Sequence, residues 1–311
     1  MIVDVHPEFG YELVCSAPYA YWLHKQGKLE KVITCKGMKP FYYFCDNVEE
    51  RYTHRSMNNQ TNGVQNLPNG WIHHNSMKVF GKDHSVMSKE EQYKANGVLD
   101  YQQWTPPPYQ EVFYDKEILL PKKYVVLSNR FNMEHGQPPI GYFDIESLYH
   151  IFDYFSSIGY EVIYKRPTNT EFTTDQNEWL SQNITADVEG FGVINDFDLT
   201  KHFNNVHLID DIISNLKLDY NTAQLKIFSR SSGFISMGGG SSIFSSYFKT
   251  PTIIYVNTSA DIRPGYFEGD SYFKKLSGAS IYPIIDKKDD ILARGYRDYS
   301  KIYKTIKKVF K

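Results

Sequence analysis

The sequence predicts a two-part α/β protein, built on parallel sheets with helices on both faces. Short apolar runs such as Tyr124–Ser128 and Thr252–Val256 alternate with segments whose apolar residues recur at helical spacing. This order predicts parallel strands connected by helices. Three consecutive prolines at 106–108 divide the chain, because such a run continues neither a helix nor a central strand.

The first part is expected to begin as strand, loop and helix. The apolar run 2–5 predicts a strand, and apolar residues at helical spacing continue from the following loop to Leu23. Pro18 is expected to start or kink this helix, because an interior proline removes a backbone donor, and Gly27 is expected to end it. A second strand is predicted at 31–35.

The stretch from residue 47 to 101 is polar and irregular, with clusters of turn residues that predict few regular elements. The sequence leaves open whether it forms a binding site or a loose insertion. The prolines that follow place a boundary near 110–120. We therefore expect an N-terminal domain of residues 1–115, a C-terminal domain of 116–290 and a closing helix in 291–311.

The second part has a regular β/α order. Apolar runs bounded by turn residues predict its strands, and helical spacing predicts the segments between them. The expected strands are 124–128, 161–164, 206–209, 233–236 and 252–256, and the expected helices are 144–158, 220–230 and 241–248.

The last segment has apolar residues on one helical face from Tyr299 to Phe310, and lysines cover the rest. A helix that docks on the body of the protein explains this pattern. A basic amphipathic helix on a membrane or an acidic partner is the alternative.

Composition excludes several classes of protein. The 311 residues are 41% hydrophobic and 16% aromatic, which indicates a globular chain, and the net charge of −2 disfavours nucleic acid as a partner. The three cysteines are too few for a disulfide framework, and no zinc signature occurs. No run is long enough for a transmembrane segment, so we expect a soluble cytoplasmic protein.

Ligands of doubly wound sheets bind outside the carboxyl ends of the strands, where three loops carry suitable residues. The first loop contains Gly238, Gly239, Gly240, Ser241 and Ser242 after a buried strand. Its glycines let the backbone approach a phosphate, and the serines open a helix whose amides favour an anion. A tight strand-to-helix turn is the alternative. The loop is neither a Walker A motif nor a G-x-G-x-x-G dinucleotide motif.

The second and third loops carry Asn129 with Arg130, and Lys165 with Arg166. An arginine fork binds a diphosphate with two charge-assisted hydrogen bonds, and an ordinary surface ion pair is the alternative. In the first part, the loop after the first strand contains His6, Glu8 and Glu12, which are candidates for a general base. Glu12 is also explained by a helix start, where the helix dipole stabilises a carboxylate.

These residues resemble a known family. The two β/α parts, the glycine-containing N-terminal loop and the segments 232–236, 241–246 and 249–254 resemble GT-B glycosyltransferases, and within them the fucosyltransferase-like branch that uses GDP-fucose. Arg130 matches the arginine of that branch. The His-x-Arg of the branch stands here as Ser128-Asn129-Arg130, and its Gly-Asn-Gln as Gly10-Tyr11-Glu12.

The resemblance implies transfer of a sugar from a nucleotide diphosphate sugar to a glycan hydroxyl, in a cleft between two Rossmann-like domains and with no metal or other cofactor. Inversion at the anomeric carbon is expected, and GDP-fucose is the favoured donor, with a UDP-sugar as the other possibility. The C-terminal helix is expected to pack back on the first domain.

Two rival functions remain at this stage. Asp196 and Asp198 form an Asp-x-Asp pattern, which holds a divalent cation in metal-dependent transferases, although a solvated loop explains it too. A non-catalytic module that binds carbohydrate or nucleotide is the second rival. Loss of donor binding in Arg130→Ala would distinguish a transferase from a lectin-like module.

Overall fold

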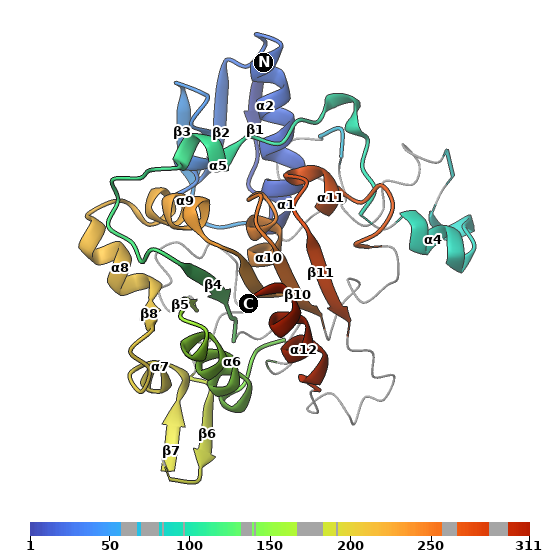
Figure 1. The fold of residues 1–311 in the computed structure, drawn as a ribbon. Helices are drawn as coiled ribbons and strands as arrows, with labels where there is room; N and C mark the ends of the chain where they lie inside the picture. The colour runs from blue at the N-terminus through green and yellow to red at the C-terminus, as the bar shows by residue number, and fades with distance from the viewer. Residues whose placement is uncertain are drawn as a thin grey trace.

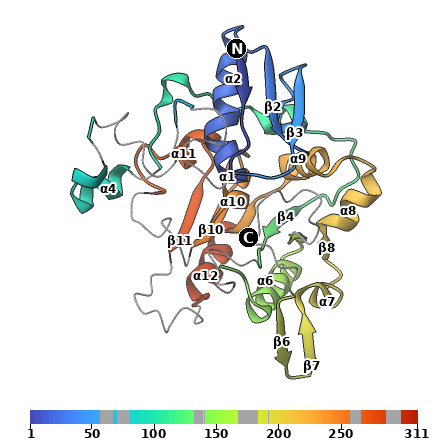
Figure 2. The same ribbon diagram turned by 180° about the vertical axis from the view of Figure 1, so that it is seen from behind.

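The computed structural model describes residues 1–56, 67–69, 81–82, 84–95, 97–131, 139, 141–166, 183–190, 192–256, 266–285 and 298–311. A small parallel sheet near the N-terminus lies next to a larger parallel sheet, and helices surround both, as Figures 1 and 2 show from opposite sides. The predicted α/β fold class with parallel sheets is confirmed.

The small sheet consists of β1 (Ile2–Asp4), β2 (Lys31–Cys35) and β3 (Val48–Tyr52), all parallel and in the order β1-β2-β3. The helical segment between β1 and β2 has three parts: α1 (Phe9–Tyr11), a π-helical turn η1 (Glu12–Ser16) and α2 (Ala17–Lys25). Pro18 lies in the first turn of α2, directly after the π-helical turn. Because proline has no N–H, the carbonyl of Val14, four residues earlier, receives no amide from it and accepts from the indole of Trp104 instead.

Short elements occupy the described parts of the stretch after β2. They are η2 (Lys39–Tyr42), η3 (His84–Val86), α4 (Lys89–Ala95), η4 (Tyr101–Gln103) and α5 (Tyr109–Phe113). The proline run before α5 is neither helix nor strand, and the indole of Trp104, just before it, donates to the carbonyl of Val14 at 2.6 Å. Because α5 packs against α9 (Tyr220–Arg230) of the second part, the boundary near residue 115 stays a prediction.

The large sheet has the strand order β11-β10-β9-β4-β5-β8. Its strands are β4 (Tyr124–Ser128), β5 (Glu161–Lys165), β8 (Val206–Leu208), β9 (Phe234–Met237), β10 (Thr252–Val256) and β11 (Ile281–Ile285). All pair in parallel. Numbered in chain order, this is the 3-2-1-4-5-6 arrangement of doubly wound nucleotide-binding sheets, so the strand order reverses between β4 and β9.

Helices cover both faces of the large sheet. Alternate side chains of each strand point to opposite faces, which gives two hydrophobic cores. One core packs against α8 (Ile209–Leu216), α9, α10 (Gly240–Ser245) and α11 (Tyr272–Leu276), and it continues into the small sheet. The other packs against α6 (Ile145–Ser157) and α7 (Asp196–Thr200). A hairpin of β6 (Thr185–Val188) and β7 (Gly192–Asn195) extends from this end.

The C-terminal helix α12 (Ser300–Val309) docks on the body of the protein, as predicted, but among the described residues its core contacts lie in the second part and not in the first domain. Its buried side chains, together with Phe310, join the second core beside α6 and β10. Tyr154 of α6 donates to the carbonyl of Phe310 at 2.7 Å. The helix α12 packs here because its apolar side chains cover the β10–β11 end of this face of the large sheet.

Among the described residues, no helix has the length and apolar character that crossing a membrane requires.

Candidate functional site

The two parts meet at the carboxyl ends of their strands. Gly10, in the short helix α1 that follows β1, lies against Gly240, the first residue of α10, which follows β9. A Cβ built on Gly10 would be 3.0 Å from Cδ1 of Ile243, and one on Gly240 would be 3.1 Å from the ring of Phe9. Glycine on both sides therefore allows this close approach, because a Cβ at either position would press against the side chain opposite it.

The glycine-rich loop turns sharply from β9 into α10. Gly239 has φ of +125°, a conformation that favours glycine, and the hydroxyl of Ser242 donates to the Gly239 carbonyl at 2.7 Å. The Gly238 amide donates to Tyr255 of β10, which fixes the start of the turn. The first amides of α10, at Gly240 and Ser241, have no acceptor within the helix and lie at its positive end.

Arg130, in the loop after β4, reaches this turn. Its Nε donates to the carbonyl of Gly141 at 2.9 Å, and Nη1 would lie 3.2 Å from a Cβ on Gly239. A Cβ on Gly141 would also clash with the guanidinium. The structure thus brings Arg130 and the glycine-rich loop together at the point where the strand order reverses.

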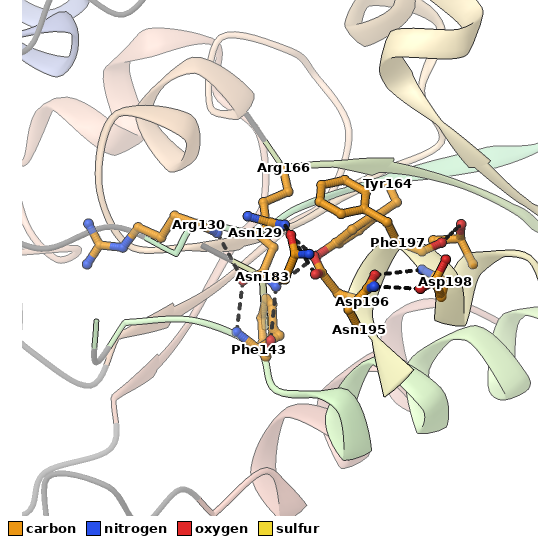
Figure 3. A network of polar contacts seen from close by, with 11 residues as sticks. Asn129, Arg130, Phe143, Tyr164, Arg166, Asn183, Asn195, Asp196, Phe197 and Asp198 are labelled. Carbon is orange, nitrogen blue, oxygen red and sulfur yellow. Dashed lines mark hydrogen bonds and ion pairs between the residues drawn. The ribbon is translucent and has the colours of Figure 1, made fainter. Parts of the chain in front are cut away.

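Asn129 is buried and acts on the protein itself. Its side-chain amide donates to the carbonyl of Phe143 and to the hydroxyl of Tyr164, while its oxygen accepts from the amides of Phe143 and Arg130 (Figure 3). These contacts fix the direction in which the loop leaves β4. We therefore assign Asn129 a role in positioning Arg130, whereas the sequence predicted direct contact with a donor.

Arg166 also lies in the interior. Its guanidinium forms an ion pair with Asp196 of α7, which also accepts from the hydroxyl of Tyr164 at 2.7 Å, and it packs over the ring of Phe197. Figure 3 shows Arg166 directed toward this cluster while the side chain of Arg130 extends away from it. This geometry therefore favours a structural role for Arg166 over the predicted role in donor binding.

The two carboxylates of the Asp-x-Asp pattern do not converge. Asp196 is buried with Arg166, while Asp198 accepts from the amide of its own N-cap residue Asn195 and from Lys201 at 2.7 Å. Among the described residues, no group of three or more His, Cys, Asp or Glu side chains is placed to hold a metal ion. The geometry therefore contradicts the metal-binding interpretation of this tripeptide, because the two carboxylates point to different places and each already has a cationic partner.

Lys165, which the sequence analysis placed with Arg166 in a loop at the ligand-binding edge of the sheet, is a buried cation beside the glycine-rich loop. It is 6% exposed, and its ammonium donates to Ser241 Oγ at 3.3 Å. Burial lowers the pKa of this ammonium to about 8. At the carboxyl edge of the large sheet, two cations therefore approach the glycine-rich loop: Arg130 lies beside Gly239, and Lys165 donates to Ser241.

Glu12, one of the three predicted bases, is fully buried in the first part. Arg55 forms an ion pair with it, and the hydroxyls of Thr34 and Tyr42 donate to it. The π-helical turn that begins at Glu12 places its side chain under the small sheet. These contacts give Glu12 a structural role, because an acceptor hydroxyl would have to displace them.

His6 lies at the carboxyl edge of the small sheet and lines a depression of about 380 Å³ together with residues 51–56. Its ring stacks on Tyr52 at 4.2 Å, and burial lowers the pKa of the imidazole, which is therefore neutral at pH 7. Its Nδ1 is buried without a hydrogen-bond partner among the described residues. Glu8 is the half-buried N-cap residue of α1, close in sequence but not part of this lining.

Known proteins give only a distant likeness. The sequence matches no protein-family model, and no curated protein is similar to it. Among solved structures, the glycosyl transferase family 9 protein from Veillonella parvula DSM 2008 is 10% identical, with a TM-score of 0.48 over 99% of this chain and 96% of that one.

The dodecameric iron-containing glycosyltransferase TibC from enterotoxigenic E. coli H10407 is 11% identical, with a TM-score of 0.43 over 93% of this chain. The structure of TibC in complex with ADP-D-beta-D-heptose has a TM-score of 0.42 to this chain. This chain spans 65% of the length of TibC.

Proposed function

We propose that the protein is a GT-B glycosyltransferase that moves a sugar from a nucleotide diphosphate sugar to a hydroxyl of a glycan acceptor. One observation carries this proposal: Arg130 and the glycine-rich loop converge where the strand order of the large sheet reverses, directly opposite the loop of the small sheet. Doubly wound sheets bind nucleotides at this place.

The chemistry follows from these positions. The bond between the anomeric carbon and the diphosphate oxygen breaks, and negative charge develops on the leaving diphosphate. The fork of Arg130 and the amides at the start of α10 stabilise that charge, which is the main requirement of the reaction. With cations supplied by the protein, the transfer is proposed to need no metal.

The acceptor is proposed to bind in the depression beside His6. Its hydroxyl attacks the anomeric carbon on the face opposite the leaving group, which inverts the configuration, and the neutral imidazole takes the proton. A neutral ring is what a general base requires at pH 7. Of the three predicted bases, His6 is favoured because it lines a depression, whereas Glu12 is enclosed.

The donor is proposed from the resemblance alone. The fucosyltransferase-like pattern around Arg130 favours GDP-fucose, and a cytoplasmic site of reaction fits a nucleotide-sugar donor. UDP-sugars, and ADP-heptose, the nucleotide sugar bound to TibC, are the other donors to be tested.

A thermal-shift screen tests the proposal. GDP, UDP, CDP, ADP and their sugars are added with and without Mg²⁺ or Mn²⁺. Ligand at 100 times its dissociation constant adds about 2.7 kcal/mol of stability. We expect stabilisation by one nucleotide class without metal, loss of the shift in Arg130→Ala, and only partial recovery in Arg130→Lys, which lacks the planar fork.

The matched control is Lys201→Ala, which removes an exposed cation outside the crevice and is expected to leave the shift unchanged. No shift with any nucleotide would refute the transferase and favour a carbohydrate-binding module. A shift that requires metal would refute the metal-independent mechanism. Incubation with the stabilising sugar nucleotide and glycan acceptors then measures transfer directly.

A further inference from the structure

Lys165 is a buried cation whose surroundings do not match its charge. It ends β5 and is 6% exposed, and in the described part of the chain its one hydrogen-bond partner is the neutral hydroxyl of Ser241, at 3.3 Å. An ammonium has three donors, and burying it without an anion is costly. Such a group indicates a site that is completed by a negatively charged ligand.

A second, independent observation points to the same place. Ser128 ends β4 and is 2% exposed, and its Oγ has no hydrogen-bond partner within the described residues. Ser128 and Lys165 are paired in register on adjacent parallel strands, so their side chains leave the same face of the sheet. A buried hydroxyl without a partner therefore lies beside a buried ammonium that is short of acceptors.

The face of the sheet separates this site from the neighbouring arginine. Ile163 of β5 belongs to the core under α9 and α10, and Lys165 follows it by two residues on that face. Tyr164 and Arg166 belong to the other face, where Arg166 meets Asp196. Of the two cations at the carboxyl end of β5, Lys165 is the one directed to the glycine-rich loop.

The charges around Lys165 favour an added anion. Asp210, at the start of α8, is the carboxylate that acts on it, and its attraction does not offset the burial, which lowers the pKa of Lys165 to about 8. The other neighbours, Ser241 of α10 and Ser128 of β4, carry no charge. A phosphate oxygen would supply the missing acceptor and hold the ammonium in its charged form.

We propose that Lys165 is a phosphate ligand of the donor site, which binds the diphosphate of a nucleoside diphosphate together with the hydroxyls of Ser128 and Ser241, at the same glycine-rich loop that Arg130 reaches. The assignment rests on the proposed function and deepens it. Lys165 makes nucleotide affinity depend on pH in the range where enzymes of this kind operate, because only its charged form binds the anion.

Calorimetric titration of the full-length protein with GDP, ADP, UDP and inorganic pyrophosphate at pH 7 and pH 9 tests the assignment. In the wild type, the charged fraction of Lys165 falls from about 0.9 to about 0.1, so affinity is expected to drop about tenfold. Lys165→Met is expected to bind at least tenfold more weakly at pH 7 and to lose the pH dependence. Lys165→Arg is expected to keep its affinity at both pH values, because arginine stays charged.

Two controls separate this role from a general loss of structure. Lys201→Met removes an exposed lysine and is expected to match the wild type, and the melting curve of each variant shows that it is folded. Guanosine, adenosine and uridine, which lack phosphate, are expected to bind wild type and Lys165→Met equally well.

The outcomes distinguish the two proposals. If the wild type binds a nucleotide and Lys165→Met binds it with the same affinity and pH dependence, the Lys165 assignment is overturned while the proposed function stands. If pyrophosphate binds in a Lys165-dependent way but no nucleotide binds, the anion site is supported and the transferase is refuted.

Discussion

Replacing Lys165 by methionine is expected to stabilise the protein at neutral pH. Burial lowers the pKa of this ammonium from the usual 10.5 to about 8. Each pKa unit corresponds to 1.36 kcal/mol, so the charged lysine costs the folded state about 3 kcal/mol. Methionine has a similar volume and gives up only the hydrogen bond to Ser241, worth about 1 kcal/mol. The net gain of about 2 kcal/mol corresponds to roughly 4 °C in melting temperature.

The stabilisation by Lys165→Met is expected to depend on pH, and the direction of the pKa shift determines how. The pKa is lower in the folded protein than in the unfolded chain, so the cost of Lys165 is complete below about pH 8. It decreases as the pH rises from 8 and vanishes above about 10.5. Melting curves followed by circular dichroism should therefore show the gain of Lys165→Met at pH 7 and its loss at pH 10.5.

The matched control is Lys201→Met, which is expected to melt like the wild type at both pH values because its ammonium is exposed. A methionine variant that melts at or below the wild type at pH 7 would refute the reasoning, since the charge would then be compensated within the protein. A gain of equal size at pH 10.5 would mean that packing, and not charge, is responsible.

Three further predictions concern other parts of the molecule. Glu12→Gln breaks the buried ion pair with Arg55 and is expected to cost about 3–5 kcal/mol in urea denaturation. The control Glu49→Gln, at a half-buried surface ion pair with Arg51, is expected to change the midpoint little, and equal midpoints for both variants would contradict the structural role of Glu12. Gly239→Ala forces a side chain to adopt a φ of +125° and is expected to weaken nucleotide binding at least tenfold by calorimetry, a loss that unchanged affinity would exclude. Phe310→Ala opens a cavity beside α6 and is expected to lower stability by about 3–5 kcal/mol, and a change below 1 kcal/mol would show that α12 contributes little to the core.

The sequence predicts much of the fold because the strands of the large sheet are covered on both faces. Such strands are short, continuous apolar runs, and β4 and β10 match the predicted ranges at both ends, as does β2 of the small sheet. The strand β3 is missed because its Val-Glu-Glu-Arg-Tyr sequence carries surface ion pairs at the sheet edge. The strand β11 is missed too, because it contains Pro283, which only an edge strand accommodates.

Part of the candidate site could be predicted from the sequence, and part of it could not. The meeting of Arg130 with the glycine-rich loop follows from adjacent parallel strands, whose carboxyl ends share one edge. The choice between Lys165 and Arg166 does not follow, because β5 is apolar on both faces and its sequence therefore does not indicate which residue points to which side. The enclosure of Glu12 depends on the π-helical turn and on Arg55, which is distant in the sequence.

The backbone contact between Gly10 and Gly240 has a consequence for how the chain unfolds. Within the part of the chain that the structure describes, the small sheet has three strands, and its core is continuous with the core under α9 and α10. A sheet of this size buries too little apolar surface to be stable by itself. The two sheets should therefore melt together in one transition, and the first 115 residues should not fold when they are produced without the rest.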